Sequence, residues 1–326
     1  MATITAYLTK RSGTHDITQM VSTCTWSGDK ASIVRKVTAG VLYAAGTGLP
    51  VPELGDALTL RDAGTTLFSG YVVRRSLDSE AYTMSVTCYD RGIYLCNNDG
   101  TYKFRDVTAE EMVRTVCNDR GIPVAELAAT GAKLSRKFTA TALDKIVTTA
   151  YSLAAEQTGE RYAVRMTPDG LLVKIKSQSR SSLILRPRSN LIRASTVQSI
   201  EKMTNSVGVY DEQGNQLQVL NDQGAVDLYG TMQRHITQKD GEDAAAKAQA
   251  LLDDGGVSET VTVEVLGDST LVTGETVIAQ EENTGLSGLF WIEADSHTWQ
   301  RSRYTARLTL NCRNVMNQAA AGSDLS

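Results

Sequence analysis

The segment GDALTLRDAGTTLFSGYVV, Gly55 to Val73, decides the fold because it consists of two apolar runs joined by a turn. Leu58 and Leu60 alternate with polar residues, which is the period of a strand with one face on a core. Asp62-Ala63-Gly64 supplies turn chemistry before the second run. The segment predicts an antiparallel hairpin, and the alternation from Tyr82 to Cys88 predicts a third strand.

The same pattern returns far along the chain. GDALTL at Gly55 is echoed by GETVIA at Gly274, and YTMSVTCYDR at Tyr82 is echoed by YTARLTLNCR at Tyr304. Both copies place an aromatic strand between the two strings, LFSGYVV in one and GLFWIEA in the other. This echo predicts a structural duplication of a β-rich module.

Composition fits a globular, multi-domain chain. The 326 residues are 41% hydrophobic and 21% charged, and their length corresponds to two or three domains. The net charge of -4 offers no bulk basic field for a nucleic acid. No apolar run approaches the ~18 residues of a membrane span, and the N-terminus lacks a secretory signal, so we expect synthesis in the cytoplasm.

The middle of the chain changes to helical periodicity near residue 98. Thr108-Ala109-Glu110-Glu111 is a capping-box pattern ahead of a helix, and a second helix is predicted from Thr141 to Gln157, closed by Gly159. A hairpin follows from Arg161 to Ile175. Residues 98 to 180 are therefore predicted to form a small α/β domain.

The remaining residues, 181 to 326, return mostly to strands. One helix is predicted near 241 to 253, where Asp240 can cap Glu242 to Leu252. The predicted strands here are Val207 to Tyr210, Leu217 to Leu220, Thr260 to Val265, Thr276 to Ala279, Leu289 to Ala294 and Tyr304 to Leu310. The fold class is therefore mainly β with an α+β insert: a β-barrel in 1–97, the α/β domain in 98–180 and a second barrel in 181–326.

We find no constellation that predicts catalysis, a cofactor or a metal. The histidines, His15, His235 and His297, lack metal-ligand spacing. Ser12 to Asp16 contains all three residue types of a catalytic triad, but they crowd a predicted turn. The acidic pairs are expected at helix ends and turns, and the basic clusters in exposed loops: Glu110-Glu111, Asp253-Asp254, Glu281-Glu282, Arg186-Pro187-Arg188 and Arg301-Ser302-Arg303.

The cysteines are five in number and none forms a C-x-x-C pair, so a disulfide framework and a zinc knuckle are both disfavoured. We expect buried free thiols at Cys24, Cys88, Cys96, Cys117 and Cys312.

An ordered series of motifs resembles the tail hub proteins of contractile phages and phage-like bacteriocins. It is similar to the late-control protein D group, and most closely to the hub proteins of defective prophages in Gram-positive bacteria. The motifs run from LFSGYV at Leu67, TCYDRGIYL at Thr87, YKF at Tyr102 and TAEE at Thr108 to IEKMTNSV at Ile200, LYGTMQ at Leu228 and GLSGLF at Gly285 with His297.

The resemblance implies two tail-tube-like barrels and no enzymatic activity. It implies a homotrimeric baseplate hub whose six barrels form a ring joining the sixfold tail tube to the threefold central spike. Its implied partners are itself, the tube and spike proteins, other baseplate proteins and the tape measure protein, with no specific nucleic acid and no stable membrane association. It places the protein in the tail baseplate of a virion or phage tail-like particle.

Two other functions remain open. One is a tail-associated peptidoglycan hydrolase, whose catalytic carboxylates would be among the acidic pairs above. The other is a monomeric carbohydrate-binding module, whose expected sign is a cluster of exposed aromatic residues. Only Trp26, Trp291 and Trp299 are available for it, and two of them lie in predicted strands.

Overall fold

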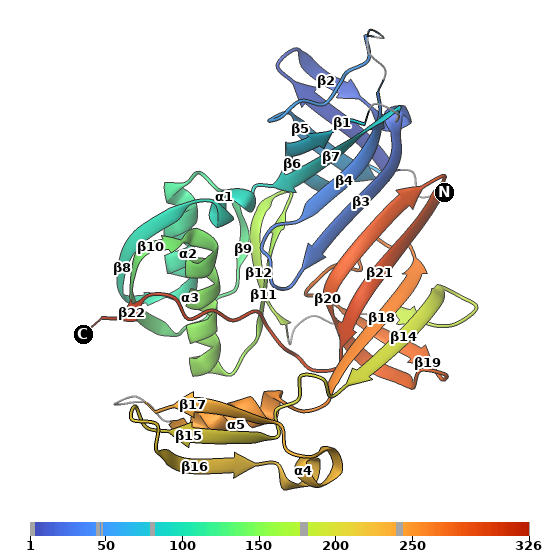
Figure 1. Ribbon diagram of the computed structural model, residues 1–326. Helices are drawn as coiled ribbons and strands as arrows, with labels where there is room; N and C mark the ends of the chain where they lie inside the picture. The colour runs from blue at the N-terminus through green and yellow to red at the C-terminus, as the bar shows by residue number, and fades with distance from the viewer. Residues whose placement is uncertain are drawn as a thin grey trace. The chain divides into compact units, whose positions relative to one another are not determined.

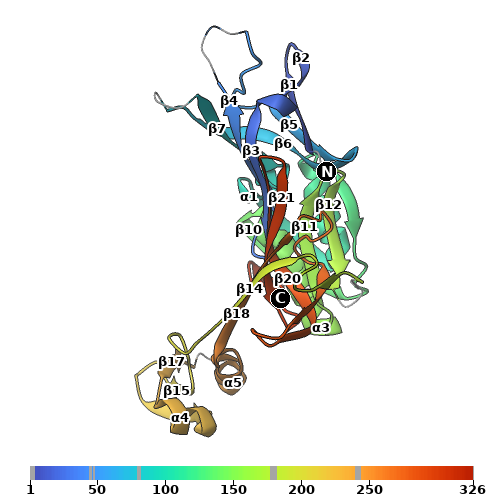
Figure 2. The same cartoon turned by 90° about the vertical axis from the view of Figure 1, so that its right-hand side faces the viewer.

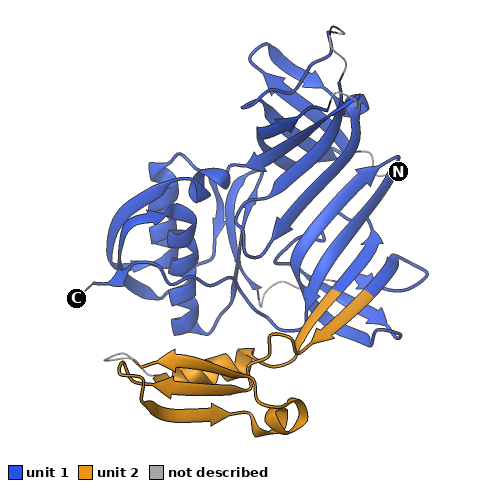
Figure 3. Ribbon diagram, in the orientation of Figure 1, with its two compact units in different colours: residues 1–194, 262–326 blue, residues 195–261 orange. Residues whose placement is uncertain are grey.

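The computed structural model describes residues 4–43, 46, 48–78, 82–176, 182–238 and 244–325. The chain is mainly β and divides into two compact units (Figure 3). Unit 1 comprises Met1–Ala194 and Thr262–Ser326, and unit 2 comprises Ser195–Val261. The boundary falls inside strands β14 (Leu191–Ser199) and β18 (Ser258–Leu266).

One hydrogen-bonded sheet contains two β-lobes, which belong to unit 1 except for Ser195–Ser199 of β14 and Ser258–Val261 of β18. The N-terminal lobe has β1 (Ile4–Lys10), β2 (Gly13–Asp16), β3 (Val21–Asp29), β4 (Lys36–Leu42), β5 (Ala57–Asp62), β6 (Thr65–Ser76) and β7 (Thr83–Asp90), with the short helix η1 (Thr18–Met20). The C-terminal lobe has β13 (Ile184–Leu185), β14, β18, β19 (Thr276–Glu281), β20 (Leu286–Gln300) and β21 (Arg303–Asn311).

The sheet runs without interruption from one lobe to the other. Its order is β14-β18-β21-β20-β3-β4-β7-β6-β5-β1-β2, and β19 joins β20 to β13. Among the described residues, no ladder connects the two ends of this path. The two closed barrels expected from the sequence are therefore an open sheet with two lobes, because β3 pairs with β20 of the other lobe.

The structure confirms the internal duplication strand by strand. The order β3-β4-β7-β6-β5 of the first lobe matches β14-β18-β21-β20-β19 of the second. Both long central strands carry the same β-bulge against their neighbours, at Val72/Arg74 in one and Ile292/Ala294 in the other. Gly55, with φ 89°, has its counterpart in Gly274, with φ 90°.

The same loop hydrogen bonds recur at these two glycines. The Gly55 amide donates to the Val72 carbonyl, and the Gly274 amide donates to the Ile292 carbonyl, both at 2.9 Å. Positive φ favours glycine, which explains why this residue begins both copies of the sequence echo.

An antiparallel ladder between β3 and β20 joins the lobes, with Cys24 opposite Trp299 and Gly28 opposite Asp295 (Figure 1). Its apolar side belongs to the core of the N-terminal lobe, which includes Trp26, Trp299 and Tyr304. Two segments far apart in the sequence thus share one core, and this makes the lobe junction rigid.

The α/β region of unit 1 packs two helices against short sheets. Its elements are α1 (Ile93–Cys96), β8 (Asp99–Thr108), α2 (Ala109–Asp119), β9 (Val124–Leu127), β10 (Lys133–Ala142), α3 (Leu143–Thr158), β11 (Tyr162–Thr167), β12 (Gly170–Ile175) and β22 (Ser323–Asp324). The predicted capping box at Thr108 and Glu111 is present, and Gly159 ends α3 with φ 74°. Both helices bury their apolar stripes with Phe138 in one core.

Unit 2 is a three-stranded sheet with helices. It holds β15 (Ser206–Tyr210), β16 (Gln216–Asn221), α4 (Gln223–Tyr229), β17 (Gln233–Thr237) and α5 (Ala244–Asp254), and α5 lies beside the sheet in Figures 1 and 2. The helix predicted near 241–253 is confirmed as α5, while Asp240, its expected cap, lies outside the described residues.

Several elements escaped sequence reasoning, among them β8, β9, β10, β14, α4 and β17. In β10, for example, only Leu134 and Phe138 of ten residues are buried, so the strand lacks regular alternation.

Candidate functional site at the lobe junction

A buried ion pair fastens the two lobes together. Asp295 lies on β20 and Arg35 directly precedes β4, and their side chains are 0% and 5% exposed. Arg35 Nη1 donates to Asp295 Oδ1 at 3.0 Å, and Nη2 contacts Oδ2. The guanidinium also stacks over the Trp26 ring, 4.0 Å from its centroid. Each charge is thus compensated by a partner from the other lobe.

Asp295 accepts further hydrogen bonds from the C-terminal lobe. The Thr273 backbone amide and hydroxyl both donate to Oδ1, at 2.7 and 2.6 Å. Burial alone would raise the pKa of Asp295, but the Arg35 charge and the hydrogen bonds from His297 and Arg35 hold that pKa well below its ordinary value. The carboxylate is therefore ionised and fixed in place.

His297 completes this buried cluster. Its Nε2 lies 3.0 Å from the Leu271 carbonyl and 3.4 Å from Asp295 Oδ2, and its Nδ1 lies 2.9 Å from the Tyr304 hydroxyl. Because a carbonyl can only accept, we assign the proton to Nε2, and Nδ1 accepts from Tyr304. The histidine is 0% exposed and satisfied, which fits a structural role.

Gly28 on β3 leaves the space through which Arg35 reaches Asp295. A Cβ at this position would lie 2.3 Å from Arg35 Nη1. The close approach of strand and guanidinium thus requires a residue without a side chain.

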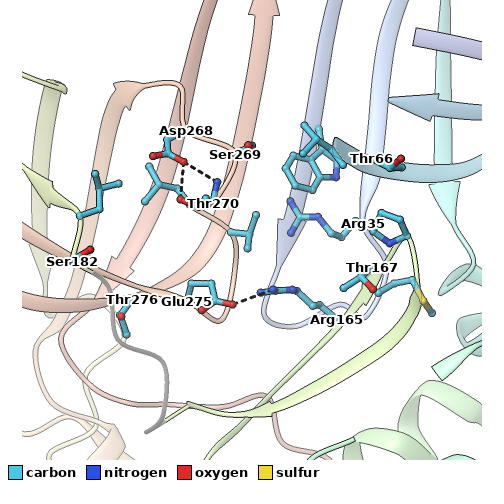
Figure 4. A pocket seen from close by; sticks show the side chains of 17 residues that line it. Arg35, Thr66, Arg165, Thr167, Ser182, Asp268, Ser269, Thr270, Glu275 and Thr276 are labelled. Carbon is cyan, nitrogen blue, oxygen red and sulfur yellow. Dashed lines mark hydrogen bonds and ion pairs between the residues drawn. The ribbon is translucent and has the colours of Figure 1, made fainter. Parts of the chain in front are cut away.

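Beside this cluster, a pocket of about 710 Å³ opens where the Asp268–Thr276 loop meets the β11–β12 hairpin (Figure 4). Arg165 reaches into it and bonds Glu275 at 3.0 Å and the Thr273 carbonyl at 2.9 Å. Burial lowers the pKa of Arg165, and Glu275 counters this effect. Arg165, on β11, thus ties the α/β region to the C-terminal lobe, whereas Arg35 ties the two lobes to each other.

Asp90, at the end of β7, ties the junction to α1. Its Oδ2 accepts the Arg35 backbone amide at 2.8 Å and its Oδ1 accepts the Gly92 amide at 2.9 Å. Burial raises the pKa of Asp90 to about 7, although both hydrogen bonds and the Arg35 charge oppose that shift. The pKa of this buried carboxyl thus lies near neutral pH.

The residues from Ser12 to Asp16 do not assemble a triad. Ser12 Oγ and His15 Nε2 are 3.5 Å apart, but Asp16 accepts the Thr18 amide at 2.9 Å instead of orienting the imidazole. His235 is exposed and stacks on Tyr210, with ring centroids 4.7 Å apart.

The acidic pairs are used locally. Glu111 belongs to the capping box, Glu110 accepts from Thr130 Oγ1 at 2.9 Å, and Glu281 accepts the Thr284 amide at 2.7 Å. The Asp253-Asp254 pair ends α5. Both basic clusters are exposed: Arg186 to Arg188 lie in a loop, as expected, and Arg301 and Ser302 form the turn before Arg303, which begins β21. These carboxylates occupy helix ends and turns, as the sequence predicted.

All five cysteines are free thiols. Cys24, Cys88 and Cys117 are buried, which confirms the prediction for these three. Cys96 is half-buried, and the prediction is wrong for Cys312, which is exposed. Trp26 and Trp299 are 5% and 6% exposed, so neither offers a sugar-binding platform.

Over the described ranges, no group of three His, Cys, Asp or Glu side chains is arranged to hold a metal ion. Among the described helices, none has the length and apolar character needed to cross a bilayer.

The sequence matches the model of a protein family described as YQBQ-like over residues 24–311. The chain belongs to the YQBQ-like family. The match extends from within β3 to the end of β21, so it includes the β3–β20 ladder and the α/β region, while β1 and β2 of the N-terminal lobe precede it.

A curated relative is the phage-like element PBSX protein XkdQ of Bacillus subtilis strain 168, 23% identical over 305 residues, which are 90% of this chain and 93% of the relative. Among solved structures, the 43 kDa tail protein of prophage MuSo2 from Shewanella oneidensis superposes with a TM-score of 0.74 at 14% identity, covering 96% of this chain and 99% of the other. The fold is that of a phage tail protein.

A further structural neighbour is the E. coli c3393 protein. It is described as a component of the type VI secretion system with structural similarity to the phage T4 tail proteins gp27 and gp5. The TM-score is 0.56 at 11% identity, with 93% of this chain and 76% of the other covered.

Sequence reasoning missed the residues that matter most here, Arg35, Asp90 and Asp295. One signal was available: Asp295 shares the alternation of His297 and Trp299, and an acid on a buried face predicts a buried partner. Nothing in the sequence identifies that partner as Arg35, which is 260 positions away.

Proposed function

We propose that this chain is the structural baseplate hub of a contractile phage tail or a phage tail-like bacteriocin. In this role it is a homotrimer whose six lobes form a pseudo-hexameric ring, with the sixfold tail tube on one face and the threefold central spike on the other. The domains are the two tube-like modules, 1–97 and 181–326, and the α/β domain, 98–180, between them.

The observation that carries this proposal is the duplicated strand order of the two lobes, fused edge to edge through β3 and β20. Two equivalent modules in one chain convert threefold symmetry of chains into approximate sixfold symmetry of modules. That is the geometry needed where a sixfold tube meets a threefold spike.

The comparisons support the same assignment. The family relative XkdQ is a phage-like element protein, and MuSo2 supplies a tail protein of the same fold. The c3393 protein, a component of the type VI secretion system, is itself described as structurally similar to the phage T4 tail proteins gp27 and gp5. The partners in this proposal are the tube and spike proteins, other baseplate proteins and the tape measure protein, in the assembled particle.

The experiment is the mass of the purified chain in solution, alone and mixed with the candidate spike, followed by electron microscopy. The proposal expects a mass of three chains in at least one sample and a ring of six lobes in projection. A monomer in both samples contradicts the hub, and a cleared band on a peptidoglycan zymogram favours the hydrolase.

A further inference from the structure

Because the two lobes have the same strand order, each has an edge that could form a junction like the β3–β20 ladder, but a single chain forms only one such ladder. In the first lobe, β3 pairs on one edge with β4 and on the other with β20. Its counterpart β14 pairs with β18, and β14 is the terminal strand of the sheet path among the described residues. The strand that corresponds to β20 is β6, so the vacant junction would join β14 to β6.

The edge of β6 is open where this pairing would occur. Along one edge of β20, the first half pairs with β19 and residues 294–300 pair with β3. β6 likewise uses its first half for β5, but among the described residues no strand follows on that edge beyond Val72. Arg74, Arg75, Ser76 and Leu77 are all exposed there. An exposed edge of this kind is a template for another strand.

Each residue of the β3–β20 junction has a structurally equivalent residue at the vacant β14–β6 junction. The matching bulges make Arg75, which lies opposite Val86, the counterpart of Asp295, which lies opposite Leu308. The Tyr43 amide donates to the Tyr82 carbonyl as the Gly267 amide does to the Tyr304 carbonyl, and this aligns β4 with β18.

The alignment of β4 with β18 places Glu259 at the position of Arg35. The buried positions agree throughout this alignment, since Val37, Ala39 and Val41 correspond to Val261, Val263 and Val265. A contact between β14 and β18 then aligns β14 with β3. A side chain at Gly28 would meet Arg35, and the Gln198 side chain donates from Nε2 to Glu259 Oε1 at 3.2 Å, which assigns Gln198 to the position of Gly28.

At the vacant junction, the positions of Arg35 and Asp295 are held by residues of the opposite charge. Glu259 lies on β18, next to the open edge strand β14, and Arg75 lies on the open edge of β6. Both residues are exposed in the single chain, and Arg75 there donates to the Pro52 carbonyl at 3.3 Å.

We infer that β14 of one chain pairs with β6 of a second copy, with Glu259 of the first chain bonded to Arg75 of the second. This inference rests on the proposed hub and names its interface. The contact is head to tail, each chain offers one edge of each kind, and the ring closes after three chains. Specificity comes from the charge pair, because two identical edges would set like charges against each other.

Charge reversal tests the pair. Arg75→Glu and Glu259→Arg, each alone, are expected to raise the concentration at which trimers dissociate by at least about tenfold. The double variant restores the contact with opposite polarity and is expected to return that concentration toward the original value. Arg74→Glu is the matched control, because neighbouring residues on a strand face opposite sides and Arg74 corresponds to Ala294.

Crosslinking provides a second readout that also captures weak association. Ser27 lies opposite Ser296 in the used junction, so Val197 is expected to lie opposite Ser76 of the neighbour. A chain carrying Val197→Cys and Ser76→Cys, with Cys312→Ser to remove the exposed thiol, should form disulfide-linked species of up to three chains. Replacing Ser76→Cys by Thr14→Cys, on the edge strand β2, should abolish them.

The outcomes separate the interface from the hub. If the dissociation concentration of the trimer is unchanged by either charge reversal and no crosslink forms, the inferred interface is wrong and the proposed hub function still stands. Crosslinks that extend into open polymers support the strand pairing and contradict the closed ring. Single reversals that dissociate a folded trimer without rescue in the double variant refute the assigned pair, and a chain that neither associates nor crosslinks refutes both proposals.

Discussion

Replacing Asp295 by asparagine should destabilise unit 1 by about 3 to 5 kcal/mol, the range for breaking a buried ion pair while one charge remains. Asp295 is fully buried, where it pairs with Arg35, accepts a hydrogen bond from Thr273 and contacts His297. Asparagine keeps the shape but removes the charge opposite Arg35, and its amide nitrogen cannot accept a hydrogen bond.

Removing both charges should cost less than removing one. The double variant Arg35→Met with Asp295→Leu leaves the Arg35–Asp295 pair without a charge, and it removes the acceptor of the Thr273 amide and hydroxyl, which bond Asp295 at 2.7 and 2.6 Å. We expect a cost of about 1 to 3 kcal/mol for the backbone amide, which, unlike the hydroxyl, cannot rotate toward another acceptor. The decisive quantity is therefore the difference between the single and the double variant, not the cost of either alone.

Urea unfolding followed by tryptophan fluorescence measures this difference, because Trp26 lies directly under Arg35. Glu264→Gln is a matched control, since its carboxylate is 41% exposed and 3.9 Å from Arg303. It should change the unfolding free energy by less than about 0.5 kcal/mol. A single variant within 1 kcal/mol of the original, or a double variant no more stable than the single, would refute the account of the junction as a charge lock.

The junction also has a pH signature. The lowered pKa of Asp295 makes its contribution present above the unfolded value of 3.8 and lost as the pH falls below it.

Three further predictions concern neighbouring features. Because burial raises the pKa of Asp90 to about 7, its contribution to stability is greatest below pH 3.8 and is lost as the pH rises to about 7. Asp90→Asn should remove a slope of up to about 1.4 kcal/mol per pH unit from unfolding curves in that window, and an unchanged slope argues against it. Thr108→Ala should cost about 1 kcal/mol in urea unfolding by breaking the capping box of α2, with Thr115→Ala, outside the cap, as comparison. Gly28→Ala should cost about 1 to 3 kcal/mol by pushing Arg35 from Asp295, and a crystal structure with Arg35 unmoved would contradict that cause.

Much of the local structure follows from residues close together in the sequence. The turn at Ala63-Gly64, the capping box at Thr108 and the alternation from Tyr82 to Cys88 each predict an element that the structure contains. The echo of Gly55 at Gly274 predicts the duplication, because equal turns and equal periodicity build equal hairpins.

The sequence by itself therefore determined the β-rich class, the α/β insert and the presence of two related modules. Tertiary structure alone decided that the modules share one open sheet, since the choice of β20 as partner for β3 depends on edges that any strand could offer. It also decided that Arg35 meets Asp295, because a pairing between residues so distant leaves no trace in local periodicity. Burial then makes the loss of either charge strongly destabilising, because an uncompensated charge is costly in the low-dielectric interior.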